Sequence, residues 1–189
     1  MSAKRIENTR LRRVMCSAAL AMIALLVTPY PTTISTVESA VREYRIRFYH
    51  THTGERIDVV YRKGDTYIPE AISLLEYHLR DHRTGDVQIF DLRLFDLLND
   101  LTSAAGLPDA EIEVISGYRS PWSNEFLRRR SCGVARYSLH MQGMAIDIRI
   151  PGIDTSYLHE LALSLSRGGV GYYPGPDFVH VDVGPVRQW

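Results

Sequence analysis

The sequence is poor in cysteine. Only Cys16 and Cys132 occur among 189 residues, and Cys16 lies inside an apolar run near the N-terminus. The single cysteine of the remaining chain cannot form an internal disulfide bond, which excludes the small folds that disulfides hold together. With this length and an apolar fraction of 45%, the chain can instead bury a hydrophobic core of its own in one domain.

The sequence also lacks an excess of positive charge. It holds 22 basic and 22 acidic residues, but residues 1–27 contain five of the basic residues and only one acidic residue. The remainder therefore has 17 basic against 21 acidic residues, a net charge of −4. Because a nucleic-acid-binding surface needs a basic footprint, we expect no nucleic-acid partner.

The apolar run at residues 14–27 is too short to span a membrane comfortably. It follows a basic segment and precedes Thr28-Pro29-Tyr30-Pro31, which is the order of a secretory signal. No Ala-x-Ala cleavage site stands out. Residues 1–27 are therefore predicted to be either a signal peptide or an uncleaved anchor, and only an uncleaved anchor would contact the membrane. Residues 28–43, rich in Thr, Ser and Pro, are predicted to be a linker, and residues 44–189 an exported domain.

Hydrophobic periodicity predicts both strands and helices in this domain. Alternating residues predict strands at 44–49, 56–61, 111–115, 145–150 and 178–183. Apolar residues at helical spacing predict helices at 68–83, 91–105, 122–130 and 155–167, with Asp91 as an N-cap. This order is typical of an α+β domain with a small central antiparallel sheet and flanking helices.

Several polar residues have both a functional and a structural interpretation. His50 and His52 lie at the turn of the first predicted hairpin, where we expect exposed polar side chains rather than metal ligands. His159 is expected to be exposed on its helix. The segment at residues 80–85, Arg-Asp-His-Arg-Thr-Gly, could contact an acidic substrate, but a helix end held by ion pairs is the favoured interpretation.

Three side chains in the last third of the sequence could hold one metal ion, namely His140, Asp147 and His180. Six residues separate His140 from Asp147, and Gly143 indicates a turn or bulge between them. Asp147 and His180 each lie in a predicted strand, and two such strands side by side could bring all three residues to one point. Imidazole and carboxylate ligands suit Zn²⁺, and a catalytic zinc typically takes three protein ligands.

The residues around these ligands resemble a known family. Residues 138–147 form the pattern S-x-H-x-x-G-x-A-x-D, and a distal His180-x-Asp182 follows. This combination is similar to that of the M15 zinc peptidases, the D-Ala-D-Ala-type cell-wall peptidases. The resemblance is closest to a branch once called a domain of unknown function. It extends from about residue 44 to the C-terminus, through residues 116–121, 124, 127, 133–135, 168–174 and 186–189.

The resemblance implies the M15, or Hedgehog-like, peptidase fold, with the zinc site on the sheet and one Zn²⁺ per chain. It implies a zinc-dependent murein endopeptidase that hydrolyses the cross-links between peptidoglycan stem peptides, either diaminopimelate–diaminopimelate or D-Ala–diaminopimelate. The alternatives are a D,D-carboxypeptidase that removes a terminal D-Ala, and a cell-wall-binding module without catalysis. A diaminopimelate wall and an export signal indicate the periplasm of a Gram-negative bacterium.

The resemblance also suggests a general base. Asp182 follows His180 by two residues and is the favoured candidate. Asp177 precedes His180 by three residues, where better-studied M15 peptidases have an acidic base, and is the alternative. Asp182 could otherwise orient a metal ligand.

Four further residues are candidates for contact with the substrate. Arg119 corresponds to an arginine of the family pattern and could bind a carboxylate or stabilise the oxyanion, or else form a structural ion pair. Ser138 is expected to fix its loop or to bind substrate. Tyr172 and Tyr173 could line the cleft with aromatic surface or simply pack at its rim.

Overall fold

The computed structural model describes residues 41–131 and 133–189. The predictions for residues 1–27, and for the linker up to residue 40, lie outside this part of the chain. Among the helices of the described part, none is both long and apolar enough to cross a membrane.

The described domain contains eight strands, four α-helices and one short 3₁₀ helix. In chain order they are β1 (Glu43–His50), β2 (Arg56–Lys63), β3 (Thr66–Tyr67), α1 (Pro69–His78), α2 (Leu92–Ala104), β4 (Glu111–Ser116), α3 (Pro121–Arg128), η1 (Leu139–Gln142), β5 (Ala145–Arg149), α4 (Thr155–Leu165), β6 (Gly169–Tyr173), β7 (Phe178–Asp182) and β8 (Arg187–Gln188).

All eight strands form one sheet in the order β3-β2-β1-β4-β5-β7-β6-β8. The predicted α+β class is confirmed, but the prediction of a small antiparallel sheet is corrected. The sheet is larger and mixed, because β1 pairs with β4 and β6 with β8 in parallel. The sequence analysis missed β3, β6 and β8. Two of these have only two residues, and β6 contains Gly169 and Gly171, which weaken a strand pattern.

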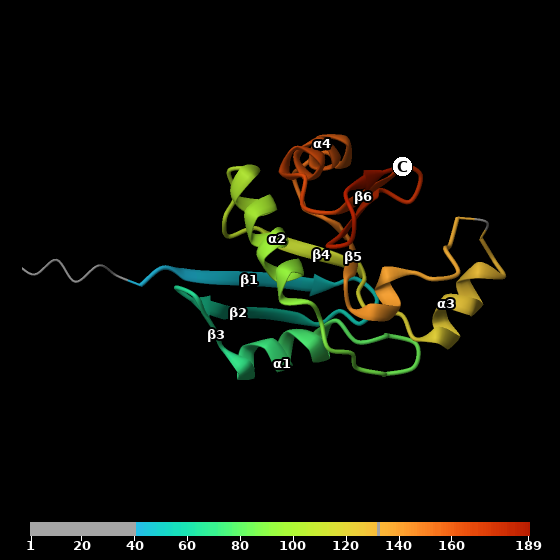
Figure 1. The fold of residues 1–189 in the computed structure, drawn as a ribbon, viewed down its shortest axis with the longest axis horizontal. Coiled ribbons are helices and arrows are strands. Elements are labelled where there is room, and N and C mark those ends of the chain that lie inside the picture. The colour runs from blue at the N-terminus through green and yellow to red at the C-terminus, as the bar shows by residue number, and fades with distance from the viewer. Residues whose placement is uncertain (1–40, 132) are drawn as a thin grey trace, which may run out of the picture. The chain divides into compact units, whose positions relative to one another are not determined.

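One face of the sheet forms a hydrophobic core with three helices. In Figure 1, α1 packs against β2, α2 against β1, and α4 against β6 and β7. Ile146 and Ile148 of β5 and Val179 and Val181 of β7 belong to this core. Because side chains alternate along a strand, the residues between them point to the opposite face. The candidate metal ligands Asp147 and His180 therefore lie on the face away from the three helices.

The helix ends differ from the predictions in ways that position the site. α1 stops at His78, five residues before the predicted end, because the segment that follows leaves the helix and bonds to the loop after β4. The Leu79 carbonyl accepts a hydrogen bond from the Tyr118 amide (2.8 Å). Asp91 caps α2 as predicted, accepting from the Arg93 amide, and α3 and α4 each end two residues before their predicted ends.

The prediction that His50 is exposed is wrong. Ile46, Phe48 and His50 lie on the buried face of β1, and His50 is 0% exposed. Burial, together with the neighbouring His78 and His82, lowers the pKa of His50 to about 4, so this imidazole is neutral at pH 7. His52 is exposed as predicted, and its ring stacks on His82 at 4.1 Å.

Candidate metal centre

Three side chains from η1, β5 and β7 converge on one point. Asp147 and His180 are direct partners in the β5–β7 pairing, so their side chains emerge next to each other on the same face. His180 Nδ1 lies 2.8 Å from Asp147 Oδ1. His140 Nε2 lies 3.1 Å from each of these two atoms. All three residues are buried, and they form a group that could hold a metal ion.

The local sequence explains how η1 presents His140. The Ser138 side chain caps η1 and accepts a hydrogen bond from the His140 amide (3.3 Å). Gly143 ends η1 with a φ of 65°, and a Cβ at this position would lie 2.2 Å from the Ile89 carbonyl oxygen. Only glycine meets both conditions, since other residues strain at this φ and bring the Cβ. The turn that the sequence indicated at Gly143 therefore fixes the position of His140.

Outer hydrogen bonds determine which nitrogen of each imidazole faces the centre. His140 Nδ1 donates to the Gly117 carbonyl (2.7 Å), so Nε2 is unprotonated and directs its lone pair inward. His180 Nε2 donates to Asp182 Oδ2 (3.1 Å), which leaves Nδ1 directed inward. Metal-binding histidines typically donate their second N–H to a carbonyl or carboxylate in this way.

Asp182 is enclosed by donors. Its Oδ1 accepts from the amides of Gly169 and Gly184, each at 2.9 Å, and from Arg187 Nη1 at 3.1 Å. Its Oδ2 accepts from His180 and, at 2.6 Å, from Arg187 Nη2. Although burial alone raises the pKa of Asp182, the hydrogen bonds from His180, Arg187 and the two amides lower it far below its usual value. This 0% exposed carboxylate has the environment of a residue that orients His180.

The electrostatics of the centre favour a bound cation. Burial lowers the pKa of His140 to about 4, so this imidazole is neutral. Burial also lowers the pKa of His180, but the hydrogen bonds of His180 with Asp147 and Asp182 outweigh burial, so the pKa is raised overall. Burial would raise the pKa of Asp147, yet His140 and Arg119 lower it well below its usual value. Three acceptor atoms thus face one another, and either a proton or a cation must lie between them.

The donor set fits zinc. Two imidazole nitrogens and one carboxylate oxygen are common zinc ligands, at distances of about 2.0–2.2 Å. In a tetrahedron of that size the ligand atoms are about 3.3–3.6 Å apart. The separations of 2.8–3.1 Å between the three inward atoms are a few tenths of an ångström shorter, so small outward shifts of the side chains would make room for the ion. The residues present could therefore hold a zinc ion with little rearrangement.

Arg119 supports this centre from the β4 side. Its Nε donates to Ser116 Oγ (2.8 Å), and its Nη2 donates to Asp147 Oδ2. Asp147 therefore offers Oδ1 to the histidines while Arg119 holds the other oxygen. Within the described residues Nη1 of Arg119 has no hydrogen-bond partner, and the side chain lines the cavity above the centre. The ion pair that we considered as the structural alternative exists, and a donor remains for substrate.

A cavity of about 430 Å³ opens over the three converging side chains. Ser138 and Tyr173, both predicted to contact substrate, line this cavity together with His140, Asp147 and His180. Trp189 also lines it, and its indole N–H donates to the Tyr173 hydroxyl (2.8 Å). The centre is therefore accessible to a ligand from one side.

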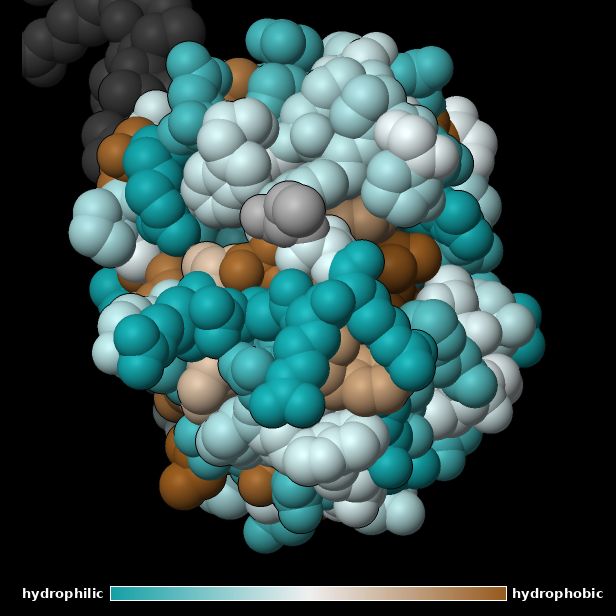
Figure 2. Space-filling model, turned by 90° about the vertical axis from the view of Figure 1, so that its right-hand side faces the viewer, coloured by the Kyte–Doolittle hydropathy of each residue, from teal (hydrophilic) through white to brown (hydrophobic). Residues whose placement is uncertain are grey.

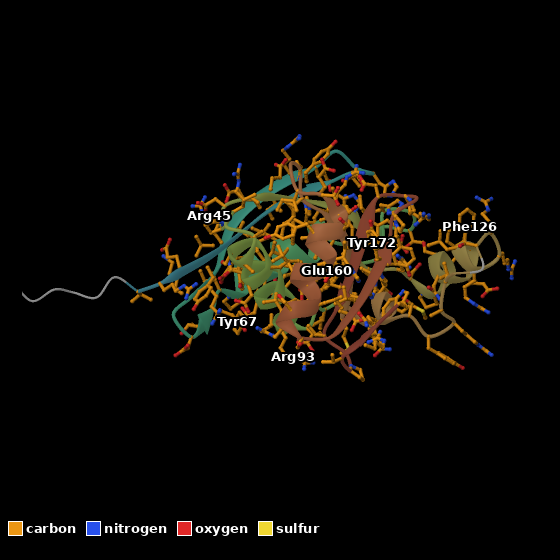
Figure 3. All side chains as sticks on the ribbon, turned by 90° about the horizontal axis from the view of Figure 1, so that it is seen from above. Arg45, Tyr67, Arg93, Phe126, Glu160 and Tyr172 are labelled. Carbon is orange, nitrogen blue, oxygen red and sulfur yellow. The ribbon has the colours of Figure 1, made fainter. Side chains whose placement is uncertain are left out.

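The structure places Tyr172 and Asp177 away from this cavity. Tyr172 lies on the opposite face of β6, beside α4 (Figure 3), where its ring stacks on His159 at 5.1 Å. This contact half-buries His159, which we had predicted to be exposed. Asp177 adopts a φ of 57° and accepts a hydrogen bond from the Thr155 hydroxyl (2.8 Å) at the start of α4.

Several polar cavity residues were not named as site candidates from the sequence, among them His52, His82, Arg83 and Arg187. His82 and Arg83 lie in the Arg-Asp-His-Arg-Thr-Gly segment, for which contact with an acidic substrate was the less favoured interpretation. Arg187 belongs to residues 186–189, which resemble the family, but its role could not be predicted because its partner Asp182 becomes its neighbour only when β8 pairs with β6.

The chain is similar to known proteins over most of its length. A family model described as peptidoglycan L,D-endopeptidase MepK, of the M15 peptidases, matches residues 38–189. A protein named "Probable peptidoglycan L,D-endopeptidase MepK" from Haemophilus influenzae is 40% identical over 171 residues, covering 90% of this chain and 92% of its own. Peptidoglycan L,D-endopeptidase MepK of Escherichia coli K12 is 39% identical over 179 residues, covering 94% and 96%.

Proposed function

The chain belongs to the peptidoglycan L,D-endopeptidase MepK family of M15 peptidases, and we propose that it is a zinc-dependent hydrolase of peptidoglycan cross-links. The observation that carries the proposal is the convergence of His140 Nε2, Asp147 Oδ1 and His180 Nδ1 below an open cavity. A zinc ion held by these atoms would lower the pKa of a bound water towards about 7 and polarise the carbonyl under attack.

The residues around the centre have complementary tasks in this proposal. Gly117 and Asp182 fix the two imidazoles by accepting their outer N–H groups. Arg119 holds Asp147 and directs its remaining N–H groups towards the cavity, where they can stabilise negative charge on the substrate carbonyl oxygen. Ser138 and Tyr173 line the path of the peptide.

The names of the relatives favour one of the two cross-links. An L,D-endopeptidase cleaves a bond from the carbonyl of an L-centre to the nitrogen of a D-centre. The diaminopimelate–diaminopimelate cross-link has this configuration, whereas the D-Ala–diaminopimelate cross-link joins two D-centres. We therefore propose the diaminopimelate–diaminopimelate bond as the substrate.

Digestion of purified cross-linked muropeptides tests this function. We expect the zinc-loaded chain to convert diaminopimelate–diaminopimelate dimers to monomers, with the mass of one water added, and a chelator to stop the reaction. Mass spectrometry identifies the bond that is cut. Loss of a terminal alanine alone would instead indicate a D,D-carboxypeptidase, and binding without cleavage would indicate a cell-wall-binding module.

The same proposal includes export. Its substrate lies outside the cytoplasmic membrane, and residues 1–27 have the charge and hydropathy order of a secretory signal. We propose a periplasmic location in a Gram-negative cell, with residues 1–27 either removed or retained as an anchor. Cell fractionation with N-terminal sequencing of the recovered chain distinguishes the two, and recovery of the whole chain from the cytoplasm would contradict export.

A further inference from the structure

The segment between α1 and α2 brings a second arginine to the cavity. Arg80 and Arg83 both belong to the Arg-Asp-His-Arg-Thr-Gly segment but have different surroundings. Arg80 forms a bidentate ion pair with Glu55, with both N–O distances at 2.9 Å. Arg83 is exposed, lines the same cavity as the three metal-binding candidates, and has no carboxylate within ion-pair distance among the described residues.

The backbone that carries Arg83 is held in place by a buried carboxylate. Asp81 Oδ1 accepts from the Arg83 amide at 2.9 Å, and Asp81 Oδ2 accepts from the Ser120 amide at 2.8 Å. Ser120 directly follows Arg119, so one side chain links the segments that carry Arg83 and Arg119. Asp81 is 1% exposed, and its hydrogen bonds to the serines and amides outweigh burial and lower its pKa to about 2. The carboxylate therefore stays charged at neutral pH.

Arg83 also lies among other positive charges. Its guanidinium carbon is 5.9 Å from the ring centre of Phe126 on α3, and that of Arg130 is 3.9 Å from the same ring. Figure 3 shows Phe126 at the end of the domain away from Arg45 and Tyr67. Burial and the nearby Arg119 and Arg130 lower the pKa of Arg83. These cations repel one another, and within the described residues Arg83 and Arg130 lack a carboxylate partner.

The cavity offers little negative charge to balance them. Among the described residues that line it, Asp147 has the only carboxylate side chain, and it is already engaged by Arg119 and the two histidines. The side of the domain that carries α3 shows strongly hydrophilic side chains gathered over hydrophobic surface (Figure 2). An anion entering this cavity therefore meets guanidinium groups without a competing acidic side chain.

We propose that Arg83, with Arg130 at the rim, forms a subsite for a carboxylate of the substrate next to the scissile bond. The substrate class rests on the proposed function. A diaminopimelate residue that is linked through the nitrogen of its D-centre keeps a free carboxylate on the same carbon atom. Arg83 binds this carboxylate through charge-assisted hydrogen bonds, which makes the free acid a better ligand than its amide.

Equilibrium binding tests the subsite independently of cleavage. The full chain is freed of metal with a chelator so that no bond is cut. It is titrated with a diaminopimelate–diaminopimelate dimer and with a second dimer. In the second dimer a carboxamide replaces the free carboxylate on the D-centre whose nitrogen forms the cross-link. We expect the free acid to bind about 10- to 100-fold more tightly, the usual value of hydrogen bonds to a charged group. In Arg83→Gln this preference should fall below about threefold.

Arg128→Gln is the matched control. It removes the same charge near the end of α3, but Arg128 is ion-paired with Glu125 (2.7 Å) and does not line the cavity. This variant should keep the full preference. Equal binding of the two dimers by the unmodified chain would overturn the subsite, and so would an equal loss for both dimers in Arg83→Gln. A retained preference in a zinc-loaded chain that cleaves neither dimer would instead overturn the proposed function alone.

Discussion

Replacing His140 or His180 with alanine is expected to abolish hydrolysis and to weaken zinc binding by more than about 100-fold. Changes outside the ligand shell of a zinc site already cost about 10- to 100-fold in affinity, so loss of a ligand atom should cost more. His140 and His180 each supply one of the three inward atoms. Zinc affinity by competition with a chelating dye, and the rate of dimer cleavage, measure the two effects.

The control for this prediction is His159→Ala. His159 lies on α4 and stacks on Tyr172, on the face of the sheet away from the metal centre. This variant should retain zinc affinity and rate. Because His140 is buried and bonded to Gly117, Asp147→Asn provides a second test that preserves side-chain shape. Full hydrolysis by folded His140→Ala and Asp147→Asn chains would show that these residues hold no catalytic metal.

Replacing Asp182 with asparagine is expected to weaken zinc binding by about 10- to 100-fold. The carboxylate orients His180 and accepts five hydrogen bonds, from His180, Arg187 and two amides. An amide group cannot accept from all these donors, so the imidazole loses its fixed orientation. We expect the hydrolysis rate to fall at low zinc and to recover in large part when zinc is saturating.

A general-base role for Asp182 predicts a different pattern. Zinc affinity would then be unchanged, while the rate would fall by about 10²- to 10⁴-fold at every zinc concentration. Asp177→Asn is the matched control, because it removes the same charge from an exposed residue that bonds to Thr155. We expect this variant to keep both properties. A loss of rate in Asp177→Asn with normal zinc affinity would assign the base to Asp177.

The convergence of His140, Asp147 and His180 could be predicted because these residues follow short-range patterns. Period-two alternation placed Asp147 and His180 on strand faces, and β5 and β7 then pair these two residues directly. The turn at Gly143 could be predicted because few residues other than glycine tolerate its backbone conformation. These features depend on residues that are close together in the sequence, so they can be predicted from the sequence alone.

The surroundings of the centre depend on contacts between distant segments. The donors around Asp182 come from β6, from Gly184 and from Arg187, and no local pattern relates them. β6 was missed because glycine is unfavourable in strands, yet Gly171 is needed there. A Cβ at this position would lie 2.6 Å from the Trp189 indole. Without β6, the opposite orientations of Tyr172 and Tyr173 could not be predicted.

His50 shows a different kind of error. The alternation of β1 placed it on the same face as Ile46 and Phe48, but a polar residue beside a turn was expected to be exposed. The parallel pairing of β1 with β4 brings this strand end into the interior of the sheet. Strand order is a tertiary property, and the predicted antiparallel sheet gave no reason to bury His50.

Zinc titration of the metal-free chain tests the central claim most directly. The full chain is stripped with a chelator, zinc is added in steps, and cleavage of the diaminopimelate–diaminopimelate dimer is followed by mass spectrometry. We predict no cleavage without metal and a rate that rises in proportion to added zinc until one equivalent per chain is present. Cleavage by the metal-free chain, or a folded chain that remains inactive at every zinc concentration, would contradict the account.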